Sequence, residues 1–235
     1  LVSRTISGMR AHRSDEAPPT QAILAPMETW ISGAEIARTV TPPSTPWIMR
    51  GRLWTTVQRH EGHAPPLPAG LRPHLAGHRV VTLVRYLEGT LRYDELILGR
   101  VARRGFTLGL FVDHIWVDSR ESVAGGRRFW GLPKEMAAFR WTGDRVEVED
   151  VDGPIATLSA SQEPARTPEI TVRVPGFGER DGALLLGTGS LKIRPRPSSL
   201  RVESLAPRFG RLLPGIRMGM DASPFELTMG DAKVL

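Results

Sequence analysis

The sequence contains no cysteine and very little lysine. The absence of cysteine from its 235 residues excludes disulfides, thiolate catalysis and cysteine-ligated zinc sites. No apolar run approaches the roughly 20 residues of a membrane-spanning helix. Only three of the 31 basic residues are lysine, at positions 134, 192 and 233. Because the chain uses arginine almost everywhere else, Lys134 is a position where arginine would not serve.

The charge of the chain does not indicate a nucleic-acid partner. The net charge is +6 and the isoelectric point is about 10.6. The arginines are nevertheless scattered along the chain, acidic residues lie between them, and no aromatic-rich RNA-binding motif is present. The first 20 residues have charges but no apolar segment typical of a secretory signal. We therefore expect a cytoplasmic protein with neither a nucleic-acid nor a membrane partner.

The composition favours a mainly β fold. The 24 glycines and 20 prolines, without long periodic helical stretches, are typical of a turn-rich β protein. About ten short strands are expected, among them HRVVTLVRYLE, RYDELILGRVA, GFTLGLFVDHIWV and the alternating RVEVEDV, in a sandwich or a barrel. Residues 1–43 form a predicted N-terminal arm, either partly flexible or an oligomer contact, with a short helix around residues 27–39. Residues 44–235 form the predicted β domain.

Several motifs that suggest chemistry have simpler explanations. The histidines at positions 60, 63, 74 and 78 lie in a proline-rich segment without HExxH spacing, so no metal site is predicted. The glycine-rich stretches 176–182 and 187–190 do not lie between a strand and a helix, and we interpret them as turns. No serine has a nucleophile-elbow motif. Asp118 with Glu121 is typical of a helix N-cap, so a short helix should begin there.

Lys134 is the strongest candidate for chemistry. It lies in GGRRFWGLPKEMAAFRW, where its neighbours include Phe129, Trp130, Leu132 and Met136. Removal from water penalises an ammonium group, and a buried lysine amine can lose its proton near neutral pH and become a nucleophile. Arginine cannot be deprotonated in this way. A surface lysine in a turn is the alternative interpretation.

The stretch VDSRESVAGGRRFWGLPKEMA resembles the signature of the acetoacetate decarboxylase superfamily. Asp118, Gly126, Arg127, Gly131, Pro133 and Lys134 stand at positions that match it. RYDEL resembles the Tyr-x-Glu segment of the family and places Glu95 at its catalytic glutamate. GRLWTTV resembles the stretch with the active-site arginine, which would be Arg52. The resemblance covers about residues 47–141.

The resemblance implies a single-domain, cone-like closed β-barrel of short antiparallel strands with one or two short helices, usually as a homo-oligomer. It implies no metal and no organic cofactor. Lys134 would attack the ketone of a small keto acid and form an imine, Glu95 would orient the substrate or transfer a proton, and Arg52 would bind a carboxylate. Together with Arg52, we expect Arg127, Phe129 and Trp130 to contact the substrate.

Two departures from the family pattern leave the reaction open. Glu135 stands where the family has a second lysine, and Arg128 where it has a glutamate. Adjacent side chains of an extended segment point to opposite faces, so Glu135 is expected to face away from Lys134 and to pair with Arg128 or another arginine. The predicted function is a Schiff-base-forming lyase, foremost a decarboxylase of a β-keto acid such as acetoacetate. The alternatives are an aldolase–dehydratase acting on pyruvate-like keto acids and a non-catalytic β-barrel that binds an apolar carboxylate ligand.

Overall fold

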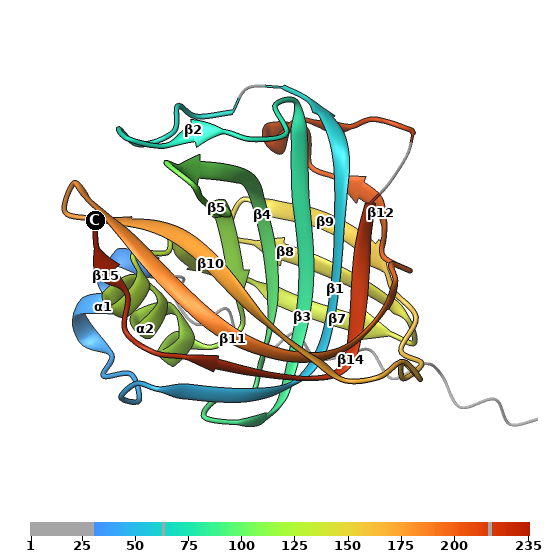
Figure 1. The fold of residues 1–235 in the computed structure, drawn as a ribbon. Helices are drawn as coiled ribbons and strands as arrows, with labels where there is room; N and C mark the ends of the chain where they lie inside the picture. The colour runs from blue at the N-terminus through green and yellow to red at the C-terminus, as the bar shows by residue number, and fades with distance from the viewer. Residues whose placement is uncertain (1–30, 63, 216–217) are drawn as a thin grey trace, which may run out of the picture.

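A closed barrel forms the centre of the molecule (Figure 1). The computed structural model describes residues 31–62, 64–215 and 218–235. Within these residues seven strands form a continuous ring in the order β4, β3, β1, β14, β11, β10, β5 and back to β4. Their bounds are β1 Trp47–Glu61, β3 His78–Gly89, β4 Tyr93–Arg104, β5 Thr107–Val117, β10 Ile170–Arg180, β11 Ala183–Pro197 and β14 Met218–Met229.

This architecture confirms the predicted mainly β, closed-barrel fold. Two details differ from the expectation. The barrel strands are 11 to 15 residues long rather than short, and β10 pairs with β5 in parallel, whereas the other neighbours in the ring are antiparallel. The parallel contact is possible because a long segment with its own sheet connects β5 to β10.

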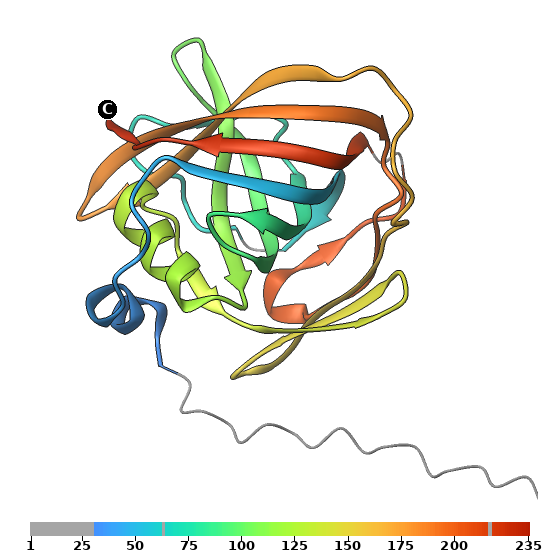
Figure 2. The same cartoon turned by 90° about the horizontal axis from the view of Figure 1, so that it is seen from below.

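A second sheet covers part of the outer face of the barrel (Figures 1 and 2). Its strands are β7 (Ala138–Thr142), β8 (Arg145–Asp150), β9 (Gly153–Ser159) and β12 (Arg201–Leu205), in the order β12-β9-β8-β7. Between the two sheets lies the largest core cluster, which includes Trp54, Leu83, Leu98, Val146 and Leu158. This part of the barrel wall is therefore buried on its outer side.

Two helices lie side by side next to the barrel (Figures 1 and 2). They are α1 (Gly33–Thr39) and α2 (Arg120–Trp130), and α2 is followed by the short strand β6 (Lys134–Met136). Short elements at the periphery complete the fold: β2 (Arg72–Pro73), the 3-10 helix Pro207–Phe209, β13 (Arg211–Leu212) and β15 (Lys233–Val234). Among the described residues, no helix is long and apolar enough to span a membrane.

Helix α1 falls within the predicted N-terminal arm. The predicted helix extended over residues 27–39, of which residues 27–30 lie outside the described part. Ile36 of α1 is fully buried in the same core cluster as Val123 of α2 and Trp47 of β1. The end of the arm therefore packs onto the barrel domain, whereas its role as an oligomer contact stays a prediction.

The two glycine-rich stretches are not turns, and this interpretation was wrong. Residues 176–180 lie in β10 and residues 187–190 in β11, and only residues 181 and 182 form the turn between these strands. The reason is close packing. A Cβ on Gly178 would lie 2.0 Å from the carbonyl oxygen of Trp130, and one on Gly131 would lie 2.8 Å from the backbone of Glu179. Glycine thus allows the end of α2 to approach β10 closely.

Candidate active site

Lys134 is buried at the start of β6, and its amine forms three hydrogen bonds. Strand β6 pairs in parallel with β5, which places Lys134 beside Ile115 of the barrel wall. Only 3% of the Lys134 side chain is exposed. Its Nζ donates to Glu95 Oε2 at 2.5 Å, to Ser122 Oγ at 2.9 Å and to Tyr93 Oη at 3.4 Å. The predicted burial of this lysine is therefore present in the structure.

Helix α2 makes the space for the lysine. The helix begins one residue later than predicted, because Ser119, not Asp118, is the N-cap and its Oγ accepts a hydrogen bond from the Ser122 amide. Asp118 instead accepts a hydrogen bond from the backbone of Asp94. A Cβ on Gly126 would lie 2.5 Å from Cδ of Lys134. The absence of a side chain at this turn of the helix is thus what accommodates the Lys134 stem.

Glu95 and two tyrosines complete the site. Tyr93 and Glu95 are two residues apart on β4 and so share one face, and Tyr86 of β3 lies directly opposite Tyr93. The phenol of Tyr86 donates to Glu95 Oε1 at 3.3 Å, and that of Tyr93 donates to Oε2 at 3.4 Å. Burial raises the pKa of both phenols well above its ordinary value, and the nearby Glu95 charge adds to this rise. Both tyrosines therefore remain neutral donors at neutral pH.

Lys134 and Glu95 form a coupled pair out of contact with solvent. Their side chains are 3% and 5% exposed, and the lysine amine and the glutamate carboxyl share a short hydrogen bond. The shared proton can reside on Lys134, which gives an ammonium beside a carboxylate, or on Glu95, which gives an amine beside a carboxylic acid. A buried ion pair loses its hydration, so its two charges are stabilised only by each other and by nearby hydrogen bonds, here those with Tyr86, Tyr93 and Ser122. The geometry thus places a lysine amine and a carboxyl that can share a proton in direct contact.

Glu135 points away from the amine, as expected. Its carboxylate pairs with the Arg127 guanidinium and accepts a hydrogen bond from the Gly33 amide at 2.6 Å. Arg127 also donates to the backbone carbonyl of Lys134 at 2.7 Å. The partner of Glu135 is therefore Arg127 rather than Arg128, which donates to the carbonyl of Ala37. These contacts connect α1, α2 and β6 behind the lysine.

The other predicted substrate contacts are placed differently. Trp130 lines the cavity in front of Lys134, and its Nε1 donates to the carbonyl of Gly230 at 2.7 Å. Arg127, Phe129 and Arg52 do not line this cavity. Phe129 packs edge-on against Trp47 and Trp130.

Arg52 lies on the opposite face of β1 from the cavity. The lining residues of this strand include Leu53, Thr55 and Val57, and strand alternation turns Arg52 outward with Trp54. Its guanidinium donates to Gln162 Oε1 at 2.8 Å. The expectation that Arg52 binds a substrate carboxylate beside Lys134 is therefore wrong.

Three residues of the site were not among the predicted ones: Tyr86, Tyr93 and Ser122. A signal for the tyrosines exists in the sequence, since they are the only two in the chain and lie in two successive predicted strands. Ser122 precedes Gly126 by one helical turn, which places both on the face of α2 toward the lysine.

The lysine lies at one end of an elongated cavity of about 520 Å³ inside the barrel. The walls are mostly apolar side chains from β1, β3, β4, β5 and β14. Among the described residues that line it, the ionisable ones are Tyr86, Tyr93, Glu95, Lys134 and Arg173. Arg173 is an exposed residue of β10. The ionisable groups other than Arg173 thus gather at the lysine.

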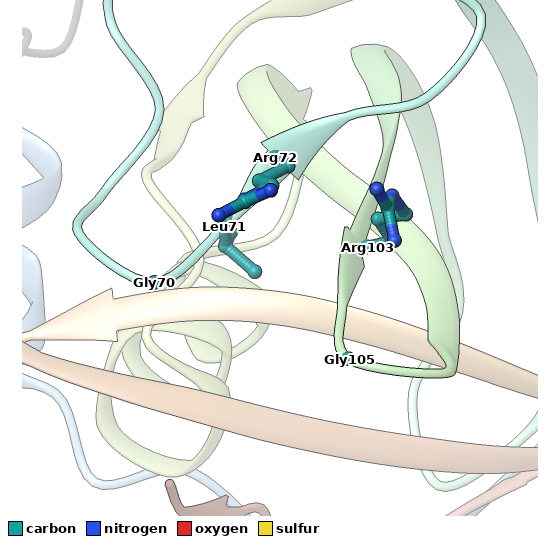
Figure 3. A pocket seen from close by; sticks show the side chains of 5 residues that line it. All are labelled: Gly70, Leu71, Arg72, Arg103 and Gly105. Carbon is teal, nitrogen blue, oxygen red and sulfur yellow. The ribbon is translucent and has the colours of Figure 1, made fainter.

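A second hollow lies near β2 and has a volume of about 510 Å³ (Figure 3). It is lined by Gly70, Leu71, Arg72, Arg103 and Gly105. The two arginines are exposed and lie opposite each other in the β2–β4 pair. The lining contains no nucleophile or proton acceptor, so this hollow is not a candidate active site.

Two of the described histidines of the proline-rich segment, His60 and His78, contact backbone carbonyl oxygens. His60 Nε2 lies 2.9 Å from the carbonyl of Phe209, and His78 Nδ1 lies 3.1 Å from that of Ala76. Within the described ranges, no three histidine or acidic side chains are grouped so as to hold a metal ion.

Comparison with known proteins identifies the family of the chain. Residues 60–176 match the acetoacetate decarboxylase (ADC) family, a range that contains both Glu95 and Lys134. The chain belongs to the acetoacetate decarboxylase-like superfamily and is an acetoacetate decarboxylase-like enzyme. Comparison of the sequence with curated proteins gives no match.

Solved structures share the barrel. An acetoacetate decarboxylase superposes with a TM-score of 0.63 at 12% identity, covering 86% of this chain and 97% of the other. The acetoacetate decarboxylase of Legionella pneumophila gives 0.60 at 16% identity, covering 91% and 93%. The enduracididine biosynthesis enzyme MppR, complexed with pyruvate, gives 0.54 at 15% identity, covering 83% and 91%. At these identities the likeness establishes the fold.

Proposed function

We propose that this enzyme decarboxylates a β-keto acid through an imine on Lys134. The observation that supports this most strongly is the buried Lys134 amine in contact with the Glu95 carboxyl at 2.5 Å, at the end of an apolar cavity. The family to which the chain belongs gives independent support.

The first steps need an amine without its proton and a group that holds that proton. Glu95 takes a proton from Lys134, and the free amine attacks the keto carbon of the substrate to give a carbinolamine. Glu95 then returns the proton to the hydroxyl that leaves as water, and a protonated imine remains. Tyr86 and Tyr93 donate hydrogen bonds that hold Glu95 in position throughout.

The imine then accepts the electrons of the broken bond. The C–C bond to the carboxylate breaks, carbon dioxide leaves, and its bonding electrons form an enamine with the iminium carbon. A proton adds to the enamine carbon, and water hydrolyses the resulting imine to a ketone and free Lys134. Each cycle thus consumes one proton and releases carbon dioxide and a ketone.

The surroundings of Lys134 favour loss of a carboxylate over its retention. Arg52 faces away, and Arg173 is the only arginine among the described lining residues. Arg173 belongs to the part of β10 beside the start of β5, whereas Lys134 lies beside Ile115 near the end of β5. A substrate carboxylate would lie between apolar walls and the acidic Glu95, where its charge is poorly stabilised. Carbon dioxide is neutral, so this cost is relieved as the C–C bond breaks.

Aldol addition and dehydration of a pyruvate-like keto acid is the second candidate. It uses the same lysine imine, and the structural likeness to MppR, solved with pyruvate, supports it. In that reaction the carboxylate is retained, so a cation would have to reach it.

The rates of carbon dioxide release and of aldehyde consumption distinguish these two reactions. The enzyme is incubated with acetoacetate, or with pyruvate and an aldehyde, and both carbon dioxide release and aldehyde consumption are followed. We expect carbon dioxide release from the β-keto acid, and inactivation by borohydride only while substrate is present. Consumption of aldehyde without carbon dioxide release would establish the aldolase, and neither activity with any keto acid would contradict both.

A further inference from the structure

The cavity that ends at Lys134 is much larger than a small keto acid requires. Its volume is about 520 Å³. At about 30 Å³ for each water-sized group, acetoacetate would fill less than half of this space. A larger substrate would bury more apolar surface and would leave less of the cavity to water.

The excess volume extends along the barrel strands away from the lysine. On β3 the lining residues reach from Tyr86 to Val80, and on β4 from Glu95 to Val101. At 3.2–3.4 Å per residue, each of these spans corresponds to about 20 Å. Leu108 of the neighbouring strand β5, which also lines the cavity, is 45% exposed, so that end opens to solvent.

The walls between the two ends offer almost no polar contact. Leu53, Ile97, Leu110 and Val112 are typical of them. The two threonines of this region, Thr55 and Thr82, are hydrogen-bonded to each other through their hydroxyls at 3.0 Å. A hydrocarbon chain is the ligand chemistry that such walls match, because a polar group there would lose its hydration without compensation.

We infer that the substrate is a β-keto acid with an extended hydrocarbon chain. The keto carbon lies at Lys134, and the chain extends along β3 and β4 toward the opening at Leu108. This inference rests on the proposed function, since it takes the lysine end as the reacting end. It replaces the small keto acid of the sequence-based prediction by a substrate whose apolar tail fills the remaining volume.

Chain length is the variable that tests this inference. A series of methyl ketones, the products of the proposed reaction, is lengthened two carbons at a time and trapped on the enzyme with cyanoborohydride. Burial of one further methylene should lower the half-saturating concentration about fourfold. We expect this gain to continue until the chain reaches the opening of the cavity and then to stop. A half-saturating concentration that is independent of length, or rises with it, would overturn the inference.

Two substitutions inside the cavity test how far along the strands the bound chain extends. Ile97→Trp should end the gain at a shorter chain than Val101→Phe, because Ile97 lies nearer to Glu95 along β4. Leu87→Trp adds an indole at an exposed position that does not line the cavity and is the matched control. Equal cut-off lengths in Ile97→Trp, Val101→Phe and the control would contradict the proposed direction of the chain.

A binding experiment keeps this inference separate from the proposed function. Secondary alcohols of the same lengths cannot form imines, and their binding is measured by calorimetry. If no ketone is trapped but alcohol affinity still rises about fourfold per methylene, the catalytic proposal fails and the apolar chain site stands. If ketones are trapped while alcohol affinity is independent of length, the chain-length inference fails alone.

Discussion

Two buried ion pairs lie on opposite faces of the barrel wall, and they differ in what their protons can do. On the cavity side Lys134 contacts Glu95 at 2.5 Å, with side chains 3% and 5% exposed. On the outer side Arg79 contacts Asp113 at 2.5 Å, with side chains 3% and 0% exposed. Distance and burial are thus nearly the same in both pairs.

The chemistry of the two cations separates these pairs. Asp113 lies at a bulge of β5 and also accepts hydrogen bonds from Arg100, so two permanent positive charges fix it. A guanidinium does not give up its proton in a protein, whereas a lysine amine can. The outer pair is therefore suited to holding strands together, and the cavity pair to proton transfer and nucleophilic attack. Under the proposed mechanism, this difference accounts for lysine at position 134 in a chain so rich in arginine.

Exchange of the two cations should produce the largest effect. Lys134→Arg keeps a positive charge beside Glu95 but removes the nucleophile, so carbon dioxide release and borohydride-dependent inactivation should both disappear. The reciprocal Arg79→Lys should retain both, because Arg79 does not line the cavity. Circular dichroism checks the fold, and Lys134→Ala avoids the extra bulk. Turnover by either Lys134 variant would contradict the assignment. Ligand binding without turnover in Lys134→Arg is expected both for this enzyme and for a non-catalytic binder, so it is turnover by the unmodified protein that distinguishes the two.

Removal of the proton acceptor should have the next largest effect. Glu95→Gln keeps the shape and one acceptor oxygen but cannot accept the proton of Lys134. General acid–base catalysis contributes about 10²–10⁴-fold, so turnover should fall at least a hundredfold. Imine trapping should remain detectable, which distinguishes this variant from Lys134→Arg. Unchanged turnover in steady-state assays of carbon dioxide release would show that another group moves the proton.

The outer pair should affect stability rather than turnover. Asp113→Asn leaves two arginines without their carboxylate, and breaking a buried pair lowers the free energy of unfolding by about 3–5 kcal/mol. The matched control is Glu226→Gln, which breaks the partly exposed pairs with Arg50 and Lys192 and should cost much less, because exposed pairs contribute little to stability. Denaturant titration measures both. Equal losses would indicate that the Asp113 cluster is not a structural pair of the proposed kind.

The tyrosines provide a smaller effect that appears at high pH. Unfolding lets both phenols ionise at their ordinary pKa, while the folded state keeps them protonated, since burial raises the pKa of Tyr86 and Tyr93. Their stabilising contribution is therefore complete below pH 10 and is lost as the pH rises above it. Each phenol contributes up to about 1.4 kcal/mol per pH unit in that range.

Phenolate absorbance reports these two side chains alone, because the chain has two tyrosines. It should appear together with unfolding, and Tyr86→Phe should reduce the alkaline loss of stability. Phenolate formation at about pH 10 in the folded protein would show that the tyrosines are accessible to solvent.

Much of the fold was predictable from the sequence. Alternating and β-branched runs indicate β3, β4 and β5, Asp118 with Glu121 indicates the helix before Lys134, and the residues around Lys134 indicate the family. The glycine-rich parts of β10 and β11 do not form the turns that we predicted, because glycine is needed there for tertiary packing. The absence of a side chain at Gly178 allows the backbone of β10 to approach Trp130 closely, and no local sequence pattern reveals this contact.

The limits at the site have a related cause. The rarity of lysine in the chain indicates Lys134, and the family resemblance indicates Glu95. The resemblance assigned Arg52 to the substrate, and alternation along β1 does not correct this, because both faces of the strand are covered, one by the cavity and one by the outer sheet. Tyr86 needs the register of the β3–β4 hairpin, which brings it opposite Tyr93. Ser122 needs the packing of α2 on β6.

The most direct test of the central claim is to locate the trapped adduct among the three lysines. Lys192 is 53% exposed and Lys233 is exposed, so both are internal controls for nonspecific reaction. After incubation with a β-keto acid and borohydride, peptide mass mapping should find the reduced adduct on Lys134 alone. Adducts on Lys192 and Lys233 with an unmodified Lys134 would contradict the account.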